Sequence, residues 1–212
     1  MAHVIGLTGQ SGAGKTTVSH IFEENGFAVI NCDEIARICT QMGSECNKKL
    51  ARVFPECFDE KLSLDRKAIS KIIFSDKKML EKFDSIVYPF ITQLIKEKIN
   101  ELSAVSQYIL LDAPTLFESG TDRVCSVKTA VVADFEKRLE RITLRDKIDK
   151  ELAEKRFASQ LSAEFFCKNC DYVIYNNGKL EDTINETLKV IRTIKEGING
   201  KEEKTQKEKN TE

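Results

Sequence analysis

The sequence has almost no net charge and no long apolar run. Its 33 basic residues nearly balance its 34 acidic ones, which leaves a formal net charge of −1. This balance argues against a protein that binds nucleic acid or a membrane surface mainly through its overall charge, although it leaves room for local patches. No apolar stretch approaches the length of a membrane span, and no signal peptide precedes the first apolar segment. We therefore expect a cytoplasmic protein with no nucleic-acid partner and no membrane partner.

The sequence also offers few ligands for a metal centre. It has seven cysteines, an odd number, and only two histidines, His3 and His20, both near the N-terminus. Cys167 and Cys170 form a close-spaced pair, but a zinc site needs about four ligands and no second close-spaced pair exists. We expect reduced thiols, with half of a zinc site or a redox pair as the alternatives for Cys167 and Cys170.

A glycine-rich stretch near the N-terminus carries the first functional signal. Gly9 to Thr16 read Gly-Gln-Ser-Gly-Ala-Gly-Lys-Thr, which matches the phosphate-binding loop pattern G-x-x-x-x-G-K-[ST]. A short apolar run precedes the loop, and Val18, Ile21 and Phe22 follow it at helical spacing. The loop thus joins a predicted strand to a predicted helix. The alternative is a glycine-rich turn with an exposed lysine.

This loop predicts a nucleoside triphosphate, ATP, bound together with Mg²⁺. Glycines let successive backbone N–H groups point inward as an anion site at a helix N-terminus. Lys15 adds a positive charge for the β- and γ-phosphates, and Thr16 offers its hydroxyl to Mg²⁺. The predicted nucleotide-binding residues are Gly9, Gly12, Ala13, Gly14, Lys15, Thr16 and Thr17, with Asn177 and Gly178 after the last strand as the proposed adenine contacts.

The spacing of apolar residues predicts one α/β domain with a parallel sheet. Hydrophobic residues make up 41% of the chain, enough for a sizeable core. Strands are expected at 3–8, 27–30, 108–111, 127–133 and 171–175, and helices at 14–25 and 180–195. The fold class is therefore α/β, a P-loop NTPase-type three-layer fold with a five-stranded parallel sheet, a helical substrate-binding insertion and a helical lid.

Two segments interrupt the core, which comprises 1–33, 104–134 and 169–196. Residues 34–103 show no strand signal and form a helical lobe of five predicted helices, with Pro89 interrupting the pattern so that the fifth runs from about 89 to 102. Residues 135–168 are helical and rich in basic residues, so they form either a basic lid or a solvated face. The tail, 197–212, is almost entirely polar and is predicted to be disordered.

Two aspartates follow predicted core strands, at the edge where open α/β sheets bind ligands. Asp33 could accept a proton from an acceptor hydroxyl, or it could cap the helix that starts near residue 34. Asp112 could bind Mg²⁺ through water, or it could be a turn residue at the strand end. Arg141 and Arg145 lie four residues apart on one helical face. They could clamp the transferring phosphate, or pair with neighbouring acidic residues at the surface.

The motif content favours a small-molecule kinase. The Asn-Lys-x-Asp pattern of GTPases is absent, and motor ATPases are usually larger than this chain. A phosphate loop, a carboxylate beside a helical insertion and a basic lid together supply what phosphoryl transfer requires: charge neutralisation, an oriented acceptor and exclusion of water.

The ordered set of motifs over residues 3 to 192 resembles the dephospho-coenzyme A kinase family. The resemblance rests on Ile5 to Thr17, on Val29-Ile-Asn-Cys-Asp-Glu-Ile-Ala-Arg37, on Tyr88-Pro89, on Asp112-Ala-Pro-Thr-Leu-Phe-Glu118, on Arg141-x-x-x-Arg145-Asp146, on Arg156-x-x-x-Gln160 and on Asp171 to Gly178. It implies ATP-dependent phosphorylation of the ribose 3′-hydroxyl of dephospho-coenzyme A, which gives coenzyme A and ADP. We expect a monomer or a weak homo-oligomer.

The resemblance also implies roles for individual residues. Asp33 would activate the acceptor. Together with the roles argued above for the other residues, the predicted catalytic set is Asp33, Lys15, Arg141 and Arg145, and Thr16 and Asp112 are the predicted Mg²⁺ ligands. The lobe at 34–103 would bind the substrate and 138–165 would act as the lid. The implied substrate contacts are Asp33, Arg37, Tyr88, Leu116 and Glu118.

Four positions depart from the family pattern. Asn31 replaces the first acid of Asp-x-Asp, and Tyr88 stands where a histidine usually precedes the proline. Thr115 replaces a leucine, and Phe166 stands where a basic residue is expected. These changes bear on the substrate more than on the reaction. The alternatives are another P-loop nucleoside or nucleotide kinase, and a nucleotide-binding regulatory protein without activity.

Overall fold

A five-stranded parallel sheet forms the centre of the computed structural model, which describes residues 2–209, with side chains for all of these except Phe74 and 201–209. The strands are β1 (His3–Gly9), β2 (Ala28–Asn31), β3 (Tyr108–Asp112), β4 (Val127–Val132) and β5 (Tyr172–Tyr175). Their order is β2-β3-β1-β4-β5, and every pair is parallel. The predicted five-stranded parallel sheet is confirmed.

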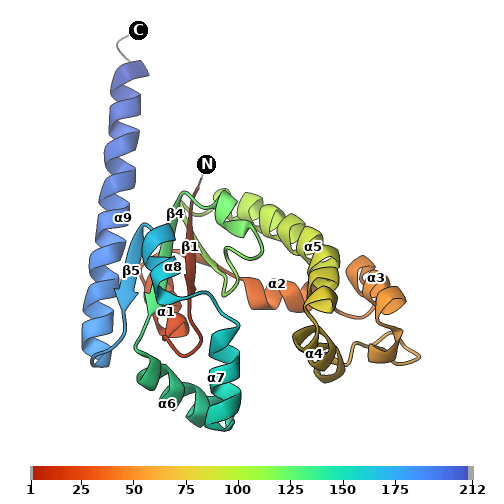
Figure 1. The fold of residues 1–212 in the computed structure, drawn as a ribbon. Helices are drawn as coiled ribbons and strands as arrows, with labels where there is room; N and C mark the ends of the chain where they lie inside the picture. Colours follow the sequence, from red (N-terminus) through yellow and green to blue (C-terminus); the bar gives the residue numbers. More distant parts are fainter. Residues whose placement is uncertain (1, 210–212) are drawn as a thin grey trace.

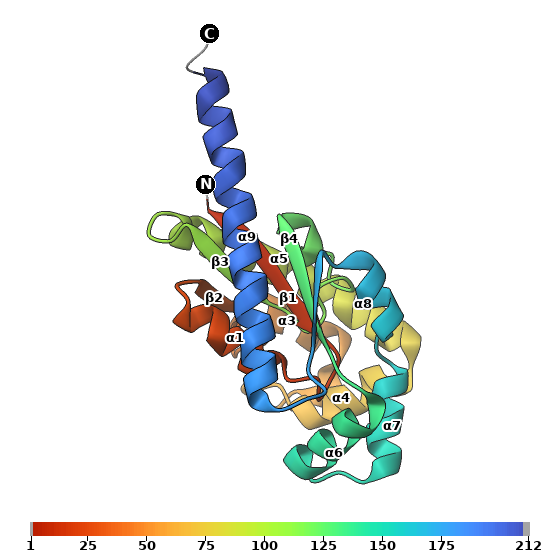
Figure 2. The ribbon, with the colours of Figure 1, turned by 90° about the vertical axis from the view of Figure 1, so that its left-hand side faces the viewer.

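Helices cover both faces of the sheet and give the predicted three layers. The helices α1 (Lys15–Glu24) and α9 (Leu180–Lys209) pack against one face, which is turned toward the viewer in Figure 2. The helices α5 (Lys77–Ser103) and α8 (Ala163–Asn169) pack against the other face. Strand β3 is buried along its whole length, with Leu110 facing the first layer and Ile109 and Leu111 facing the second. This two-sided burial explains its continuous apolar run.

The insertion after β2 is a helical lobe beside the sheet (Figure 1). It consists of α2 (Cys32–Cys39), α3 (Glu45–Val53), a short 3₁₀ turn (Pro55–Cys57), α4 (Arg66–Ser75) and α5. A polar side chain caps the start of each α-helix of the lobe by accepting hydrogen bonds from backbone N–H groups of its first turn. The capping residues of α2, α3, α4 and α5 are Asn31, Ser44, Asp65 and Asp76. The lobe and one face of the sheet share a single apolar core, so the insertion is held against the nucleotide-binding part.

Pro89 does not end a helix, which corrects one prediction. The helix α5 runs without a break from Lys77 to Ser103, with Pro89 inside it. A proline inside a helix removes one hydrogen bond at a cost of about 3 kcal/mol. Apolar residues on both sides of the proline, Val87, Phe90, Ile91 and Ile95 among them, pack into the lobe core and offset that cost. Tertiary packing therefore overrides the local signal.

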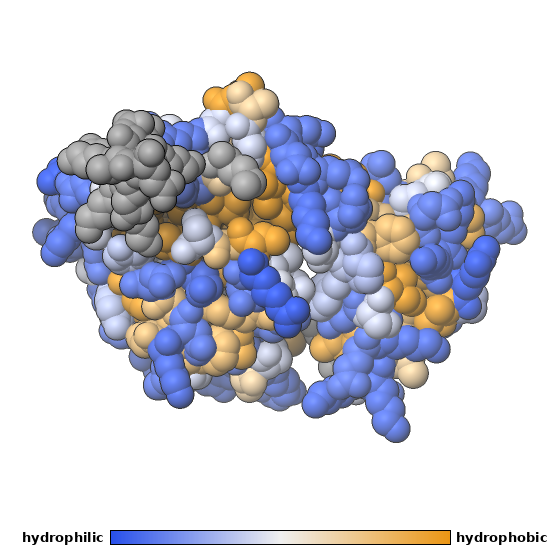
Figure 3. All heavy atoms as spheres, turned by 90° about the horizontal axis from the view of Figure 1, so that it is seen from above, coloured by the Kyte–Doolittle hydropathy of each residue, from blue (hydrophilic) through white to orange (hydrophobic). Residues whose placement is uncertain are grey.

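The helices α6 (Phe135–Asp146) and α7 (Lys150–Ala158) lie beyond the carboxyl ends of the strands (Figure 1). A second 3₁₀ turn (Thr121–Val124) precedes β4. The surface seen in Figure 3 is mostly hydrophilic, with smaller apolar areas between the charged side chains. None of the helices described combines the length and the apolar character needed to cross a bilayer.

The tail is helical over most of the segment that we predicted to be disordered. Helix α9 continues through 197–209, and residues 210–212 lie outside the described part of the chain. Ile198 is 7% exposed within the sheet core, and the amide oxygen of Asn199 accepts a hydrogen bond from the Tyr108 hydroxyl at 3.1 Å. The apolar period of the last helix extends one turn further than 195, which explains why the core reaches Ile198.

Candidate active site

The phosphate-binding loop adopts the backbone that its glycines permit. Strand β1 ends at Gly9 and helix α1 begins at Lys15. Gly9, Gly12 and Gly14 have φ angles of 150°, 80° and 98°, which residues with a Cβ rarely adopt. No side chain among the residues described caps the start of α1. The first N–H groups of the helix are thus left to an anion, as expected for a phosphate site.

Arg141 and Asn176 hold this loop through its backbone carbonyls. Arg141 donates to the Gly12 carbonyl at 3.2 Å and to the Asn176 carbonyl at 3.1 Å, and the Asn176 amide donates to the Ala13 carbonyl at 2.8 Å. Thr183, on α9, donates in turn to the Asn176 side-chain oxygen at 2.9 Å. These bonds hold the carbonyls of Gly12 and Ala13 against α6 and the segment after β5.

A second set of contacts holds the tip of the loop. The Gln160 side chain accepts from the Ser11 N–H at 3.1 Å and donates to the Ser11 hydroxyl at 2.6 Å. Arg138 donates to the Ser11 carbonyl at 3.0 Å, and its guanidinium lies 4.1 Å above the Phe157 ring. Arg138 is 6% exposed, and this burial lowers the pKa of its guanidinium. The segment between β4 and β5 therefore supports the loop directly.

Lys15 and Asp112 form an ion pair at the centre of the site. Asp112 is 5% exposed at the end of β3, beside Leu7 of β1 and Asn31 of β2 in the sheet register. The side chain of Thr16 is exposed at the start of α1. A hydroxyl and a carboxylate are hard oxygen ligands, so Thr16 and Asp112 fit Mg²⁺ by their chemistry.

No group of three or more His, Cys, Asp or Glu residues within the described part of the chain is placed to hold a metal ion. Cys170 is partly buried, and burial raises its pKa to about 12. The exposed Cys167 thiol lies 3.5 Å from the Tyr175 hydroxyl.

Asn31, and not Asp33, caps the first helix of the lobe. The side-chain oxygen of Asn31 accepts from the Asp33 N–H at 2.9 Å and from the Glu34 N–H at 3.2 Å. Helix α2 begins at Cys32, two residues earlier than predicted, so Asp33 lies in its first turn. The Asp33 carboxylate is exposed and accepts no hydrogen bond from a described residue. Helix capping was the alternative role for Asp33, and Asn31 fills that role instead.

A small cavity of about 60 Å³, here called the acceptor cavity, lies against Asp33. Its walls come from α2, α5 and the segment after β3, and its lining includes Cys32, Asp33, Ala36, Tyr88, Ile91, Ile95, Ala113, Pro114, Thr115, Ser119 and Thr121. Burial, followed by the charges of Asp112 and Asp33, raises the pKa of the Cys32 thiol to about 12. The cavity thus joins the lobe to the end of β3 around one free carboxylate.

Tyr88 brings an uncharged hydroxyl to this cavity where the family pattern has a histidine. Burial and the Asp84 carboxylate raise the pKa of Tyr88, so it stays neutral. Burial also raises the pKa of the Asp84 and Glu118 carboxyls. Tyr88 and Thr115, two of the four departures, therefore lie at the same cavity as Asp33.

The remaining predicted residues divide between the site and its surroundings. Arg37 is exposed one turn after Asp33 on α2. Leu116 is fully buried beneath Gly6, which places it in the core and not at a substrate surface. Glu118 lines a second cavity beside Ser119. The Asn177 amide exchanges two hydrogen bonds of 2.7 Å with Asp134, and so fixes the loop after β5 to the start of α6.

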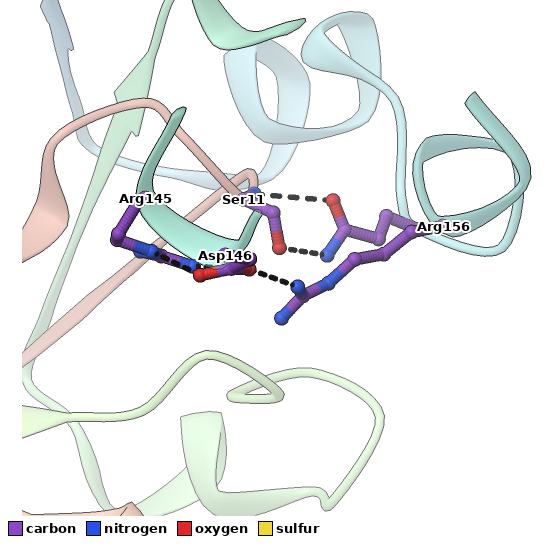
Figure 4. Close-up of polar contacts among 5 residues, drawn as sticks. Ser11, Arg145, Asp146 and Arg156 are labelled. Atoms are coloured by element: carbon purple, nitrogen blue, oxygen red, sulfur yellow. Dashed lines mark hydrogen bonds and ion pairs between the residues drawn. The ribbon is translucent and has the colours of Figure 1, made fainter. Parts of the chain in front are cut away.

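Arg145 is paired with an acidic side chain in this structure. It donates to Asp146 at 2.7 and 3.0 Å, and Arg156 donates to the same carboxylate at 2.6 Å. These bonds, with that from Arg145 first, lower the pKa of Asp146. Figure 4 shows this chain of charges next to Ser11. The surface pairing that we considered for Arg145 is thus present.

Sequence reasoning missed the supports of the loop. Arg138 and Asp134 had no predicted role, and Asn176 and Gln160 entered only as parts of motifs. Each acts through a contact between residues far apart in the chain, so helical spacing cannot reveal it. One signal was available in the sequence: Asn176 and Gln160 each follow the end of a helix or strand, β5 for Asn176 and α7 for Gln160. In the structure both of these ends lie at the phosphate loop.

Three comparisons place these features among known proteins. A family model described as dephospho-CoA kinase matches residues 3–182. A dephospho-CoA kinase from Fusobacterium nucleatum is 38% identical over 191 residues, which are 90% of this chain and 98% of the relative. A solved dephospho-CoA kinase from Campylobacter jejuni is 27% identical, with a TM-score of 0.70 over 93% of this chain and 99% of its own.

A shikimate kinase from Acinetobacter baumannii is 17% identical, with a TM-score of 0.52 over 93% of this chain and 95% of its own. At this identity the likeness concerns the fold alone. It agrees with the phosphate loop, the parallel sheet and the layers described above.

Proposed function

The chain belongs to the dephospho-coenzyme A kinase family and is an ATP-dependent kinase, and from this premise we propose that Asp33 activates the acceptor. The carboxylate takes the proton from the ribose 3′-hydroxyl of dephospho-coenzyme A as that oxygen attacks the γ-phosphorus of ATP. The bond between the γ-phosphorus and the β,γ-bridging oxygen breaks, ADP leaves, and the proton passes from Asp33 to solvent. The products are coenzyme A and ADP.

One observation carries this proposal: the Asp33 carboxylate is free of the capping role and lines the acceptor cavity. A carboxylate already bound to two backbone N–H groups would be a weaker base, because hydrogen bonds to the charged form stabilise it. Asn31 provides those bonds instead. The loss of the first acid of Asp-x-Asp therefore removes a second charge from the site while it keeps the helix start intact.

The donor side of the site is proposed to work through the phosphate loop. Lys15 leaves Asp112 for the β- and γ-phosphates, and the loop N–H groups bind the anionic oxygens. Thr16 and Asp112 would hold Mg²⁺, which supplies charge neutralisation at the phosphates when it is bound. Arg145 exchanges Asp146 for the transferring phosphate, and Arg141 keeps the loop in place. Asn177 and Gly178 remain the proposed adenine contacts, the first now also tied to Asp134.

The segments are proposed to divide the work. Residues 34–103 bind the acceptor, because four of their side chains line the cavity at Asp33 together with the segment after β3. Residues 135–168 act as the lid, since they already contact the loop through Arg138 and Gln160. A cytoplasmic location is supported by the cysteines, which form no disulfide within the described part of the chain. A monomer or weak homo-oligomer stays a proposal that light scattering tests.

Asp33→Asn tests the role of the base. The variant should lower kcat by about a hundredfold or more, because general base catalysis typically contributes that much, while calorimetry finds ATP binding unchanged. Glu34→Gln is the matched control, since Glu34 is the adjacent exposed carboxylate and does not line the cavity. Full turnover in Asp33→Asn would remove Asp33 from the mechanism. Equal turnover of simple nucleosides, with none of dephospho-coenzyme A, would refute the proposed acceptor.

A further inference from the structure

A larger cavity, here called the outer cavity, lies next to the acceptor cavity. Its volume is about 530 Å³, which falls within the range of small-molecule sites, roughly 300 to 1,000 Å³. Helix α5 supplies one wall through Thr92 and Lys96, and the segment between β3 and β4 supplies the other through Phe117, Glu118, Ser119, Gly120, Arg123 and Val124. Ser119 lines both cavities. The two cavities therefore adjoin at Ser119.

The outer cavity carries two cations that no described side chain neutralises. Lys96 and Arg123 come from opposite walls, both are exposed, and neither forms an ion pair with a described residue. Elsewhere on α5, Lys98 pairs with Glu101 at 2.6 Å. Glu118 is the single acid in the lining. Its charge acts on Tyr88, a residue of the acceptor cavity, and burial raises the pKa of its carboxyl.

The acceptor cavity has the opposite character. Its lining contains the carboxylate of Asp33 and no lysine, arginine or histidine. It suits a neutral hydroxyl that faces a base, and it offers nothing to a polyanion. An acceptor that carries a diphosphate on the 5′ side of the same ribose must place that group in adjoining space, because the 3′ and 5′ substituents leave one sugar ring in different directions.

We propose that the outer cavity binds the diphosphate of the acceptor, with Lys96 and Arg123 as its partners. The inference rests on the proposed function, because it takes the acceptor to be a nucleotide with a 5′-diphosphate ester. Arg123 offers a planar fork of donors to the phosphate oxygens, and Lys96 adds a point charge from the facing wall. Thr92 and Ser119 bring hydroxyl groups to the same space. Recognition of the diphosphate selects acceptors that carry it over nucleosides that present the same hydroxyl.

Lys96→Gln and Arg123→Gln test this assignment in steady-state assays of ADP release. Each variant should raise KM for dephospho-coenzyme A about tenfold or more, since a lost charge-assisted hydrogen bond has an effect of that order. The values of kcat and of KM for ATP should stay within about twofold, because neither residue contacts the donor site. Lys96→Arg and Arg123→Lys keep the charge and should recover most of the affinity. Lys98→Gln, on the same helix, is the matched control and should behave like the wild type.

The outcomes separate this inference from the function on which it rests. If the wild-type protein does not phosphorylate dephospho-coenzyme A, the proposed function fails. If the wild type is active and the glutamine variants keep its KM, the outer cavity does not bind the diphosphate. An equal rise in KM for ATP, or a similar loss in Lys98→Gln, would assign the two cations to the fold and would also overturn the proposal.

Discussion

Gln160 is the side chain whose removal tests most directly how the phosphate loop is held. Its amide makes two hydrogen bonds to Ser11, one with the backbone N–H at 3.1 Å and one with the hydroxyl at 2.6 Å. Each neutral hydrogen bond contributes roughly 1 kcal/mol net. Gln160→Ala therefore removes about 2 kcal/mol of free energy that stabilises the ordered loop. In the variant, ATP binding must also order the loop, so ATP should bind with a Kd about thirtyfold weaker.

Gln160→Glu separates geometry from charge. A carboxylate of the same shape can still accept from the Ser11 N–H, and the Ser11 hydroxyl can turn to donate to it. The loop should keep its order, but a negative charge now lies beside the triphosphate. We expect ATP affinity to fall in this variant as well, and to recover partly as salt is added, because ions screen the repulsion. In Gln160→Ala, salt should restore little.

The assays are calorimetric titration with Mg·ATP and hydrogen exchange at the Ser11 amide. The exchange should speed up in Gln160→Ala and stay near the wild-type rate in Gln160→Glu. Gln93→Ala is a matched control, because Gln93 is exposed on α5 and donates only to Glu97 at 2.7 Å. Unchanged ATP affinity together with unchanged exchange in Gln160→Ala would refute the claim that Gln160 orders the loop.

Two further predictions concern the cap and the thiols. Asn31→Ala removes the oxygen that accepts from Asp33 and Glu34, so urea unfolding should show a loss of about 1 kcal/mol, whereas Asn31→Asp should be nearly neutral; equal losses in both would contradict the capping assignment. Burial raises the pKa of Cys125 to about 12 and that of Cys46 to about 11, above the ordinary value of 9.0. The folded protein therefore holds these thiol protons more tightly than the unfolded chain does. The thiols add their full stabilisation below the thiol pKa of the unfolded chain, and this stabilisation is lost as pH rises from 9 toward 12. Thermal unfolding should show a falling Tm over this range, with a shallower slope in Cys46→Ala; the same slope in both proteins would exclude this thiol as a cause.

The strands and the phosphate loop could be predicted because their signals are local. The apolar run at Tyr108–Asp112 is buried on both faces, and the spacing from Gly9 to Thr16 requires one backbone path. Asp33 and Asp112 were each predicted to lie at the end of a core strand, at the edge where open α/β sheets bind ligands. Cys32, next to Asp33, feels the charge of Asp112, which places the two carboxylates in the same region.

The failures came from competition between local signals and packing. Pro89 is a strong helix-breaking signal, but the apolar faces on both sides of it share the lobe core. The polar end of the chain was predicted to be disordered, yet Ile198 and Asn199 attach one more turn of α9 to the sheet. Leu116 belongs to a motif that suggests a substrate contact, and only the structure shows that it packs beneath Gly6.

Residues far along the chain anchor the phosphate loop, and this determines when the ATP site can form during synthesis. A growing chain contains the whole phosphate-loop sequence almost from its start, but Gln160 lies 149 positions after Ser11 and Asn176 lies 163 positions after Ala13. Contacts of such separation form late, because the intervening chain must first be made and folded. Most of the chain must thus be synthesised before the ATP site is complete. Nucleotide can stabilise only chains that are nearly complete, and it cannot help the early sheet to assemble.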